Sequence, residues 1–288
     1  MTTALARPEL PLVFTCAGEE LLGILHPPGK GARVRGVLIV VGGPQYRVGS
    51  HRQFVLLARA LAAQGYPAMR FDYRGMGDSG GGLRDFEGAD EDIGAAIEAF
   101  FHACPGMSEV VLWGLCDAAS AAASLAYRDE RIAGLVLLNP WVRTEAGEAR
   151  TQLRHYYLTR LREPEFWRRL LTFRWNPLRS LAEVAGAVRR LASPSAGDGT
   201  SSVAGQALPE RMRAGLERFA GPVLVLLSGR DLTAREFEDT VAASSRWRAW
   251  MDRDRVTIQR FPEADHTFSR AAWRAEVEAA TCEWLGRW

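Results

Sequence analysis

Short apolar runs alternate along this chain with longer segments in which apolar residues recur every three or four positions. The apolar runs predict strands at residues 35–41, 67–72, 110–113, 132–138, 222–227 and 256–261. The helical spacing predicts helices at residues 51–64, 89–102, 117–127, 234–250 and 271–285. Strand and helix alternate at crossover spacing, so the pattern predicts an α/β fold with a mostly parallel, doubly wound sheet.

Two segments depart from this alternation. Residues 12–15 and 20–26 flank a glycine and predict an antiparallel hairpin that leads into the sheet. Residues 141–220 show no strand pattern and are rich in aromatic residues and arginine. They predict an inserted helical cap with a flexible loop at residues 193–202, between a first core part (residues 1–140) and a second (residues 221–288).

Composition limits the class of protein. Of the 288 residues, 47% are hydrophobic and 24% are charged, with a net charge of +2, which is typical of a globular domain and does not favour a nucleic-acid partner. No apolar run is long enough for a membrane span, and the first residues lack a signal-peptide pattern. The four cysteines are scattered without disulfide or metal-ligand spacing, so we expect a cytoplasmic protein without a metal or redox cofactor.

Candidate chemistry centres on residues 110–120, which read VVLWGLCDAAS. A strand, a sharp turn and a small-residue helix are typical of a nucleophile elbow, here with Cys116 in place of the usual serine. Gly114 and Ala118 supply the small side chains that such a turn needs. The alternative is a buried core cysteine, because free cysteine is among the most buried residue types.

Two later residues complete a possible triad with Cys116. Asp231 and His266 each follow a predicted strand, and the order nucleophile, acid, histidine is that of α/β-hydrolases. We expect His266 to take the proton of Cys116, and Asp231 to fix the imidazole tautomer. Read singly, Asp231 could be a turn residue and His266 a surface histidine. Asp265 is a rival acid, but a carboxylate next to the histidine cannot easily reach its ring.

Backbone N–H groups near the elbow are candidates for an oxyanion hole. We expect one donor from Asp117 and one from Gly43, since Pro44 in the same loop has no N–H. Gln45 and Tyr46 in that loop, and Trp141 at the start of the predicted cap, are the candidate substrate contacts.

The loop at residues 74–82 carries two misleading strings. Residues 75–80 match the dinucleotide-binding pattern GxGxxG, but the next helix starts too late for that role. Residues 77–81 spell GDSGG, a serine-protease string that belongs to a β-barrel fold rather than to a parallel sheet.

Three segments together resemble a known family: FDYRGMGDS (residues 71–79), GGPQYRVGSHR (residues 42–52) and GLCDAAS (residues 114–120). They resemble the α/β-hydrolase superfamily and, within it, the exosortase A system-associated hydrolases of type 1, over nearly the whole chain. The resemblance implies an α/β-hydrolase fold and a cytoplasmic enzyme encoded near exopolysaccharide and protein-sorting genes, with an unsettled substrate. The cysteine elbow also resembles those of dienelactone hydrolases and polyhydroxyalkanoate synthases. Val41 departs from the superfamily, which usually has histidine before the two glycines.

These observations predict a hydrolase that cleaves an ester or thioester through an acyl-enzyme on Cys116. A thiol nucleophile also suits an acyltransferase with a non-water acceptor, and a non-catalytic binding protein is the third reading. Residues 141–190 hold eleven Arg against five Glu, a net +6 that suits an acyl group carried on CoA or an acyl carrier protein. A solvated arginine-rich helix face explains that charge more simply. The acyl group, the acceptor and the oligomeric state stay open.

Overall fold

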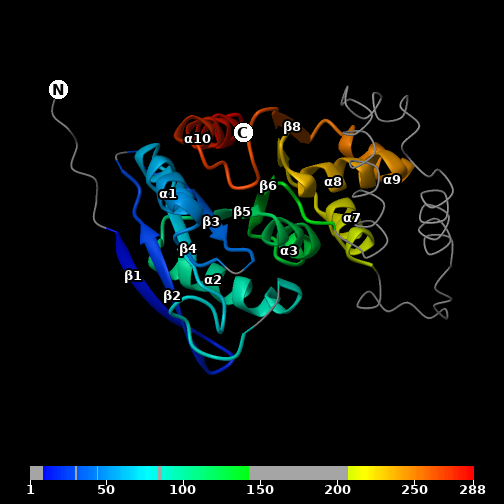
Figure 1. The fold of residues 1–288 in the computed structure, drawn as a ribbon. Helices are drawn as coiled ribbons and strands as arrows, with labels where there is room; N and C mark the ends of the chain where they lie inside the picture. The colour runs from blue at the N-terminus through cyan, green and yellow to red at the C-terminus, as the bar shows by residue number, and fades with distance from the viewer. Residues whose placement is uncertain (1–8, 30, 44, 84–85, 143–206) are drawn as a thin grey trace, which may run out of the picture. The chain divides into compact units, whose positions relative to one another are not determined.

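The fold was analysed in a computed structural model, which describes residues 9–29, 31–43, 45–83, 86–142 and 207–288. Eight strands form one sheet in the order β1-β2-β4-β3-β5-β6-β7-β8 (Figure 1). The strands are β1 (Leu10–Cys16), β2 (Glu19–His26), β3 (Arg35–Val40), β4 (Ala68–Phe71), β5 (Glu109–Leu115), β6 (Ile132–Leu138), β7 (Val223–Ser228) and β8 (Val256–Phe261).

The sheet is parallel except at one edge. β1 pairs antiparallel with β2, and β2 pairs antiparallel with β4, whereas every pair from β4 to β8 is parallel. The central strands are buried along almost their whole length, as apolar runs covered on both faces should be. The predicted hairpin and the predicted mostly parallel sheet are therefore confirmed.

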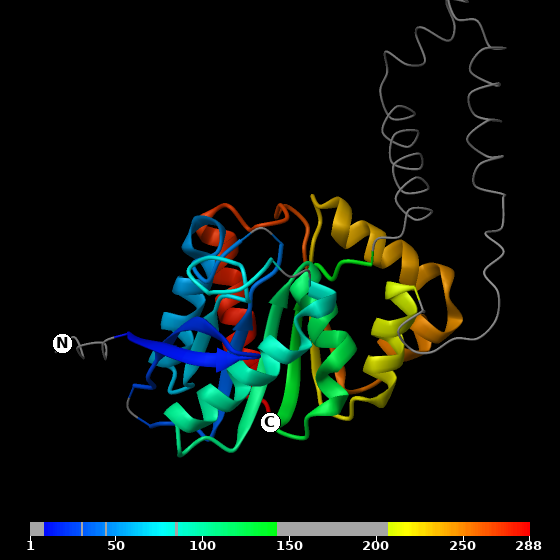
Figure 2. The same cartoon turned by 90° about the horizontal axis from the view of Figure 1, so that it is seen from below.

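Helices cover both faces of the sheet. Apolar residues of α1 (Gln53–Ala63) and α10 (Ala271–Leu285) join one buried cluster, and those of α2 (Asp90–Ala103) and α3 (Asp117–Leu125) join the other. Figure 1 shows these two pairs on opposite sides of the strands, and Figure 2 turns the second pair toward the reader. The second cluster also takes in α7 (Leu208–Arg218), α8 (Leu232–Ala243) and α9 (Ser245–Met251).

The predicted helix at residues 234–250 is wrong as a single element. It divides into α8 and α9 because Ser244 takes an extended conformation, with φ −123° and ψ 122°. The Ser244 side chain then accepts a hydrogen bond from the N–H of Trp247 and caps α9. The apolar periodicity continues across Ser244, so the sequence pattern did not indicate that one helix ends and another begins there.

Most of the predicted cap lies outside the described residues. Within residues 141–220 the structure describes residues 141–142 and 207–220, and the loop at residues 193–202 lies outside. Helix α7, in the described part, packs against α3. In the part of the chain that the structure describes, no helix has the length and apolar character needed to cross a membrane.

Candidate active site

The carboxyl ends of the parallel strands bring the candidate residues to one edge of the sheet. Gly43 follows β3, Cys116 follows β5, Asp231 follows β7 and His266 follows β8. Open α/β sheets place their sites at this edge because the strand-to-helix loops converge there.

Cys116 stands at a strained turn between β5 and α3. Its φ of 62° and ψ of −123° lie in a region that costs a residue with a side chain about 1–3 kcal/mol. The turn is tight: a Cβ on Gly114 would lie 2.7 Å from the backbone of Ala118. Backbone hydrogen bonds hold it, from the Cys116 N–H to the carbonyl of Leu138 at 2.9 Å and from the Trp141 N–H to the carbonyl of Cys116 at 3.2 Å. Such strain is found at functional sites more than elsewhere.

Asp231 presents its carboxylate to His266. The Oδ2 atom of Asp231 lies 2.8 Å from Nδ1 of His266. The same carboxylate is the N-cap of α8, because it accepts hydrogen bonds from the N–H groups of Thr233 and Ala234, each at 3.1 Å. Asp231 is buried, so its charge acts on the imidazole with little screening by solvent.

His266 lies between the acid and the thiol. Burial disfavours its charged form, but hydrogen bonds to Asp231 and then to Cys116 outweigh burial and raise the pKa of His266 to about 10. The imidazole is therefore positively charged at neutral pH. Asp265 is occupied elsewhere, because its carboxylate accepts a hydrogen bond from the N–H of Ser269 at 2.9 Å.

The other three cysteines have different surroundings from Cys116. Burial raises the pKa of Cys16 and of Cys282 to about 11, and it also raises the pKa of Cys104. These side chains remain thiols at neutral pH. Cys116 differs in that it is, after Asp231, the side chain that favours the charged form of His266.

Asn139 orders the histidine loop, although no sequence motif marks it. It is fully buried, and its Nδ2 atom donates to the carbonyl of His266 at 3.2 Å and to Oγ of Ser228 at 2.8 Å. Its Oδ1 atom accepts the N–H of Ser228, also at 2.8 Å. The sequence feature that could have indicated this role is the position of Asn139, a polar residue directly after the buried strand β6.

One of the two predicted oxyanion donors, Gly43, binds a carboxylate of the protein itself. The Gly43 N–H donates to Oδ2 of Asp117 at 2.7 Å, and the Ala118 N–H donates to Oδ1 at 3.0 Å. Burial raises the pKa of Asp117, against these backbone hydrogen bonds and the positive charge of His266. The structure thus places the Gly43 N–H on a group that the sequence did not place there.

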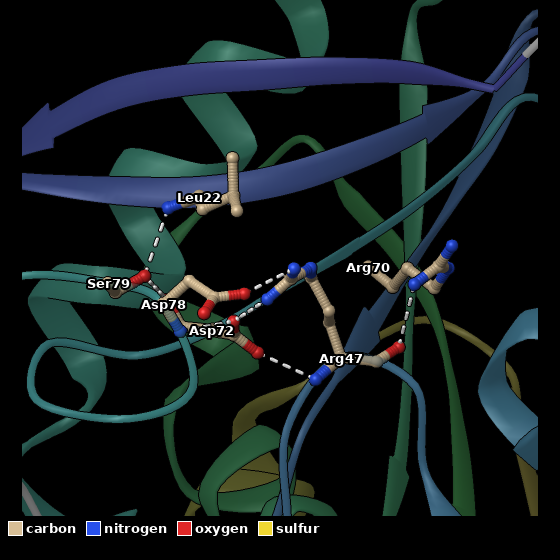
Figure 3. A network of polar contacts seen from close by, with 6 residues as sticks. All are labelled: Leu22, Arg47, Arg70, Asp72, Asp78 and Ser79. Atoms are coloured by element: carbon tan, nitrogen blue, oxygen red, sulfur yellow. Dashed lines mark hydrogen bonds and ion pairs between the residues drawn. The ribbon is translucent and has the colours of Figure 1, made fainter.

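An ionic network around the buried carboxylate of Asp72 fixes the loop that carries Gly43 (Figure 3). Asp72, at the end of β4, accepts the N–H of Arg47 at 2.6 Å and pairs with its guanidinium. The guanidinium also pairs with Asp78, and Arg70 donates to the carbonyl of Arg47 at 3.2 Å. The loops after β3 and β4 are therefore tied together.

The glycine-rich loop is closed upon itself and upon β2. The Gly75 N–H donates to the carbonyl of Gly80 at 2.7 Å, and the Gly80 N–H donates to the carbonyl of Glu20 at 2.8 Å. In the same network, Ser79 accepts the N–H of Leu22 (Figure 3). Helix α2 begins at Asp90, well beyond the motif. This loop is a structural connection rather than a dinucleotide-binding turn.

The three predicted substrate contacts have different surroundings. Trp141 lies beside the elbow, held there by its backbone hydrogen bond to Cys116 and by an edge-to-face contact with Phe86 at 5.3 Å. Gln45 uses its side-chain oxygen to accept the N–H of Ser50 at 3.2 Å. Tyr46 is 47% exposed. Within the described residues, no three His, Cys, Asp or Glu side chains cluster as metal ligands.

Comparisons with known proteins agree with this architecture. A family model described as the alpha/beta hydrolase family matches residues 37–280. No curated protein sequence matches the chain.

Solved structures share the fold at low identity. The esterase Pf2001 of Pyrococcus furiosus has a TM-score of 0.65 and 15% identity, covering 98% of this chain and 93% of its own. Est1E of Butyrivibrio proteoclasticus, with ferulic acid bound, has a TM-score of 0.61 and 17% identity, covering 95% and 97%. The esterase domain of a Rhodothermus marinus protein has a TM-score of 0.59 and 17% identity, covering 98% and 99%.

Proposed function

Because the chain belongs to the alpha/beta hydrolase family, we propose that it cleaves an ester or thioester through an acyl-enzyme on Cys116. The observation that carries this proposal is the position of His266. It is hydrogen-bonded to Asp231 on one side and to Cys116 on the other, next to a strained strand-to-helix turn. A nucleophile, a base and an orienting acid in hydrogen-bond contact are the arrangement that covalent catalysis needs.

The proposed reaction has two halves. The sulfur of Cys116 attacks the acyl carbon, and the carbonyl electron pair moves onto oxygen. When the carbonyl re-forms, the bond to the alcohol or thiol breaks, and the leaving group takes the proton held by His266. Water then gives a proton to His266 and attacks the thioester, which releases the acid and leaves the sulfur and the protonated His266 as they began.

The charge of His266 favours a thiol over a hydroxyl at the elbow. A histidine with a pKa of about 10 is charged at neutral pH and holds a proton that the leaving group can take. A serine hydroxyl at this position would need a neutral imidazole as its base. This supports Cys116 as the group that attacks the substrate.

Transfer to a non-water acceptor is the second candidate, and the cysteine itself favours it. A thioester at Cys116 exchanges readily with other nucleophiles. An acyl group carried on CoA or an acyl carrier protein fits the arginine excess of residues 141–190. The narrower resemblance to exosortase-associated hydrolases belongs to this proposal and rests on the three sequence segments given above. A non-catalytic role would leave the contacts among Cys116, His266 and Asp231 without a purpose.

Intact-mass measurement after exposure to an acyl probe tests the proposal. The protein is mixed with a p-nitrophenyl ester and, separately, with an S-acyl N-acetylcysteamine thioester. We expect one acyl adduct on wild-type protein, none on Cys116→Ala, and an unchanged adduct on the matched control Cys282→Ala. An adduct that added alcohol or amine clears faster than water favours transfer. Equal labelling of Cys116→Ala removes Cys116 from the mechanism, and no labelling by either probe counts against both catalytic readings.

A further inference from the structure

The carboxylate of Asp117 occupies the place where a substrate's oxyanion is expected. Its Oδ2 atom receives the Gly43 N–H at 2.7 Å, and its Oδ1 atom receives the Ala118 N–H at 3.0 Å. The fit is close on the other side as well, because a Cβ on Gly42 would lie 2.0 Å from Oδ1 of Asp117. A side chain of this protein thus occupies the N–H that the loop after β3 provides, together with an N–H of the elbow helix.

An ionised carboxylate there opposes acylation in two ways. A hydrogen bond to a charged acceptor is about twice as strong as one between neutral groups, so Gly43 gives it up at a cost. A negative charge held beside a developing oxyanion also repels it. Both effects disappear when Asp117 is neutral or turned away.

We propose that Asp117 is a positioning residue that controls the oxyanion donor Gly43, so that the acyl oxygen gains this N–H only when the carboxylate releases it. The inference rests on the proposed acylation of Cys116. It adds that the Asp117 side chain blocks the oxyanion site when no substrate is bound. Loss of the charge at position 117 then makes the Gly43 N–H available to the substrate. The residue acts through Gly43 and does not react with the substrate.

Three titratable groups of the described chain face Asp117. Cys116 precedes it on the elbow, His266 approaches from the loop after β8, and Tyr73 approaches from the loop after β4. Burial and the negative charge of Asp117 raise the pKa of Tyr73 well above its ordinary value, so this phenol stays protonated. Cys116 and His266 titrate in both proteins, and the Asp117 charge also interacts with His266. The ratio of rates therefore reports position 117 most directly at pH values where His266 has the same charge in both proteins.

The experiment compares Asp117→Asn with wild-type protein. The rate of adduct formation on Cys116 is measured with the p-nitrophenyl ester by intact mass between pH 4 and 9. We expect the variant to acylate about fivefold faster or more at high pH, because asparagine has the same shape but offers Gly43 a neutral acceptor. The ratio should fall toward one at low pH, where wild-type Asp117 is protonated. Asp252→Asn, at an exposed position, should give a ratio near one throughout.

The outcomes separate this inference from the proposed function. The inference is overturned if the variant acylates more slowly at every pH, or if the ratio of variant to wild-type rate does not change with pH. Either result is expected if Asp117 only stabilises the turn at Gly42. Equal thermal unfolding of the two proteins shows that the change is not one of folding. If Cys116 of both proteins stays unlabelled, the proposed function fails and the inference fails with it. If both label at equal rates, the inference alone fails.

Discussion

His266 and His26 are two partly or fully buried histidines whose surroundings drive their charge in opposite directions. Burial disfavours the cation at both. At His266 the hydrogen bonds to Asp231 and Cys116 outweigh burial, and the pKa rises to about 10. At His26 burial acts together with the positive charge of Arg70, against a weaker effect of Glu9, and the pKa falls to about 4.

The geometry of the partners explains the contrast. Oδ2 of Asp231 lies 2.8 Å from a ring nitrogen of His266, whereas Oε1 of Glu9 lies 3.9 Å from Nδ1 of His26. The other nitrogen of His26 accepts a hydrogen bond from Nε of Arg70 at 2.9 Å, and a nitrogen that accepts carries no proton. His26 therefore holds a buried arginine in place, whereas the surroundings of His266 favour a protonated ring, as its proposed role requires.

Replacing each histidine by glutamine gives the largest expected difference. His266→Gln removes the base, and we expect kcat/KM for the ester probe to fall about 10⁴-fold with little change in stability. His26→Gln should leave kcat/KM within about twofold and lower the free energy of unfolding by about 1–3 kcal/mol, because the contact with buried Arg70 is disturbed. Steady-state kinetics and urea unfolding measure the two effects. A similar loss of activity in both variants would erase the distinction between the sites.

Removing the charge of Asp231 has the next largest effect. Asp231→Asn keeps an N-cap for α8, so stability should change little, but the imidazole loses its anionic partner. We expect kcat/KM to fall about 10³-fold. The pKa of His266 should drop from about 10, which moves the alkaline limb of the pH–rate profile to lower pH.

Asp265→Asn is the matched control for this change. Asp265 adjoins His266 in sequence, but its carboxylate bonds to Ser269. Its replacement should leave the alkaline limb where it is and reduce kcat/KM only a few-fold. If Asp265→Asn shifts the limb and Asp231→Asn does not, the acid has been assigned to the wrong residue.

The sheet could be predicted from the sequence because its central strands are continuous apolar runs, and these depend on burial alone. The approach of Asp231 to His266 was predictable for a related reason, since the carboxyl ends of parallel strands meet at one edge. Contacts between loops were not predictable in the same way. Nothing in the pattern of apolar and polar residues predicts the hydrogen bond between Gly43 and the Asp117 side chain. The same is true of the hydrogen bond from Asn139 to the carbonyl of His266. Each depends on backbone direction at a turn, which short stretches of sequence do not determine.

A further predicted effect concerns stability and pH. The folded protein keeps His26 neutral down to about pH 4, whereas the unfolded chain takes up the proton near pH 6.5. The unfolded state therefore binds more protons between these values, so this contribution to stability is complete above pH 6.5 and is lost as the pH falls to about 4. The loss amounts to about 3 kcal/mol. Urea unfolding at several pH values, with His26→Gln as reference, measures it.

Glu9→Gln sharpens this comparison, because Glu9 is the acidic neighbour of His26. The charge of Glu9 raises the pKa of His26 slightly, so its removal should lower that pKa further and move the loss of stability to lower pH. At pH 7 the variant should lose only about 1 kcal/mol, since the pairs of Glu9 with Arg59 and Arg70 involve a side chain that is 30% exposed. A shift of the loss to higher pH would contradict this assignment, because removal of a negative neighbour cannot raise the pKa of His26 through its charge. The contrast with His266 would then rest on burial and not on the nearby charges.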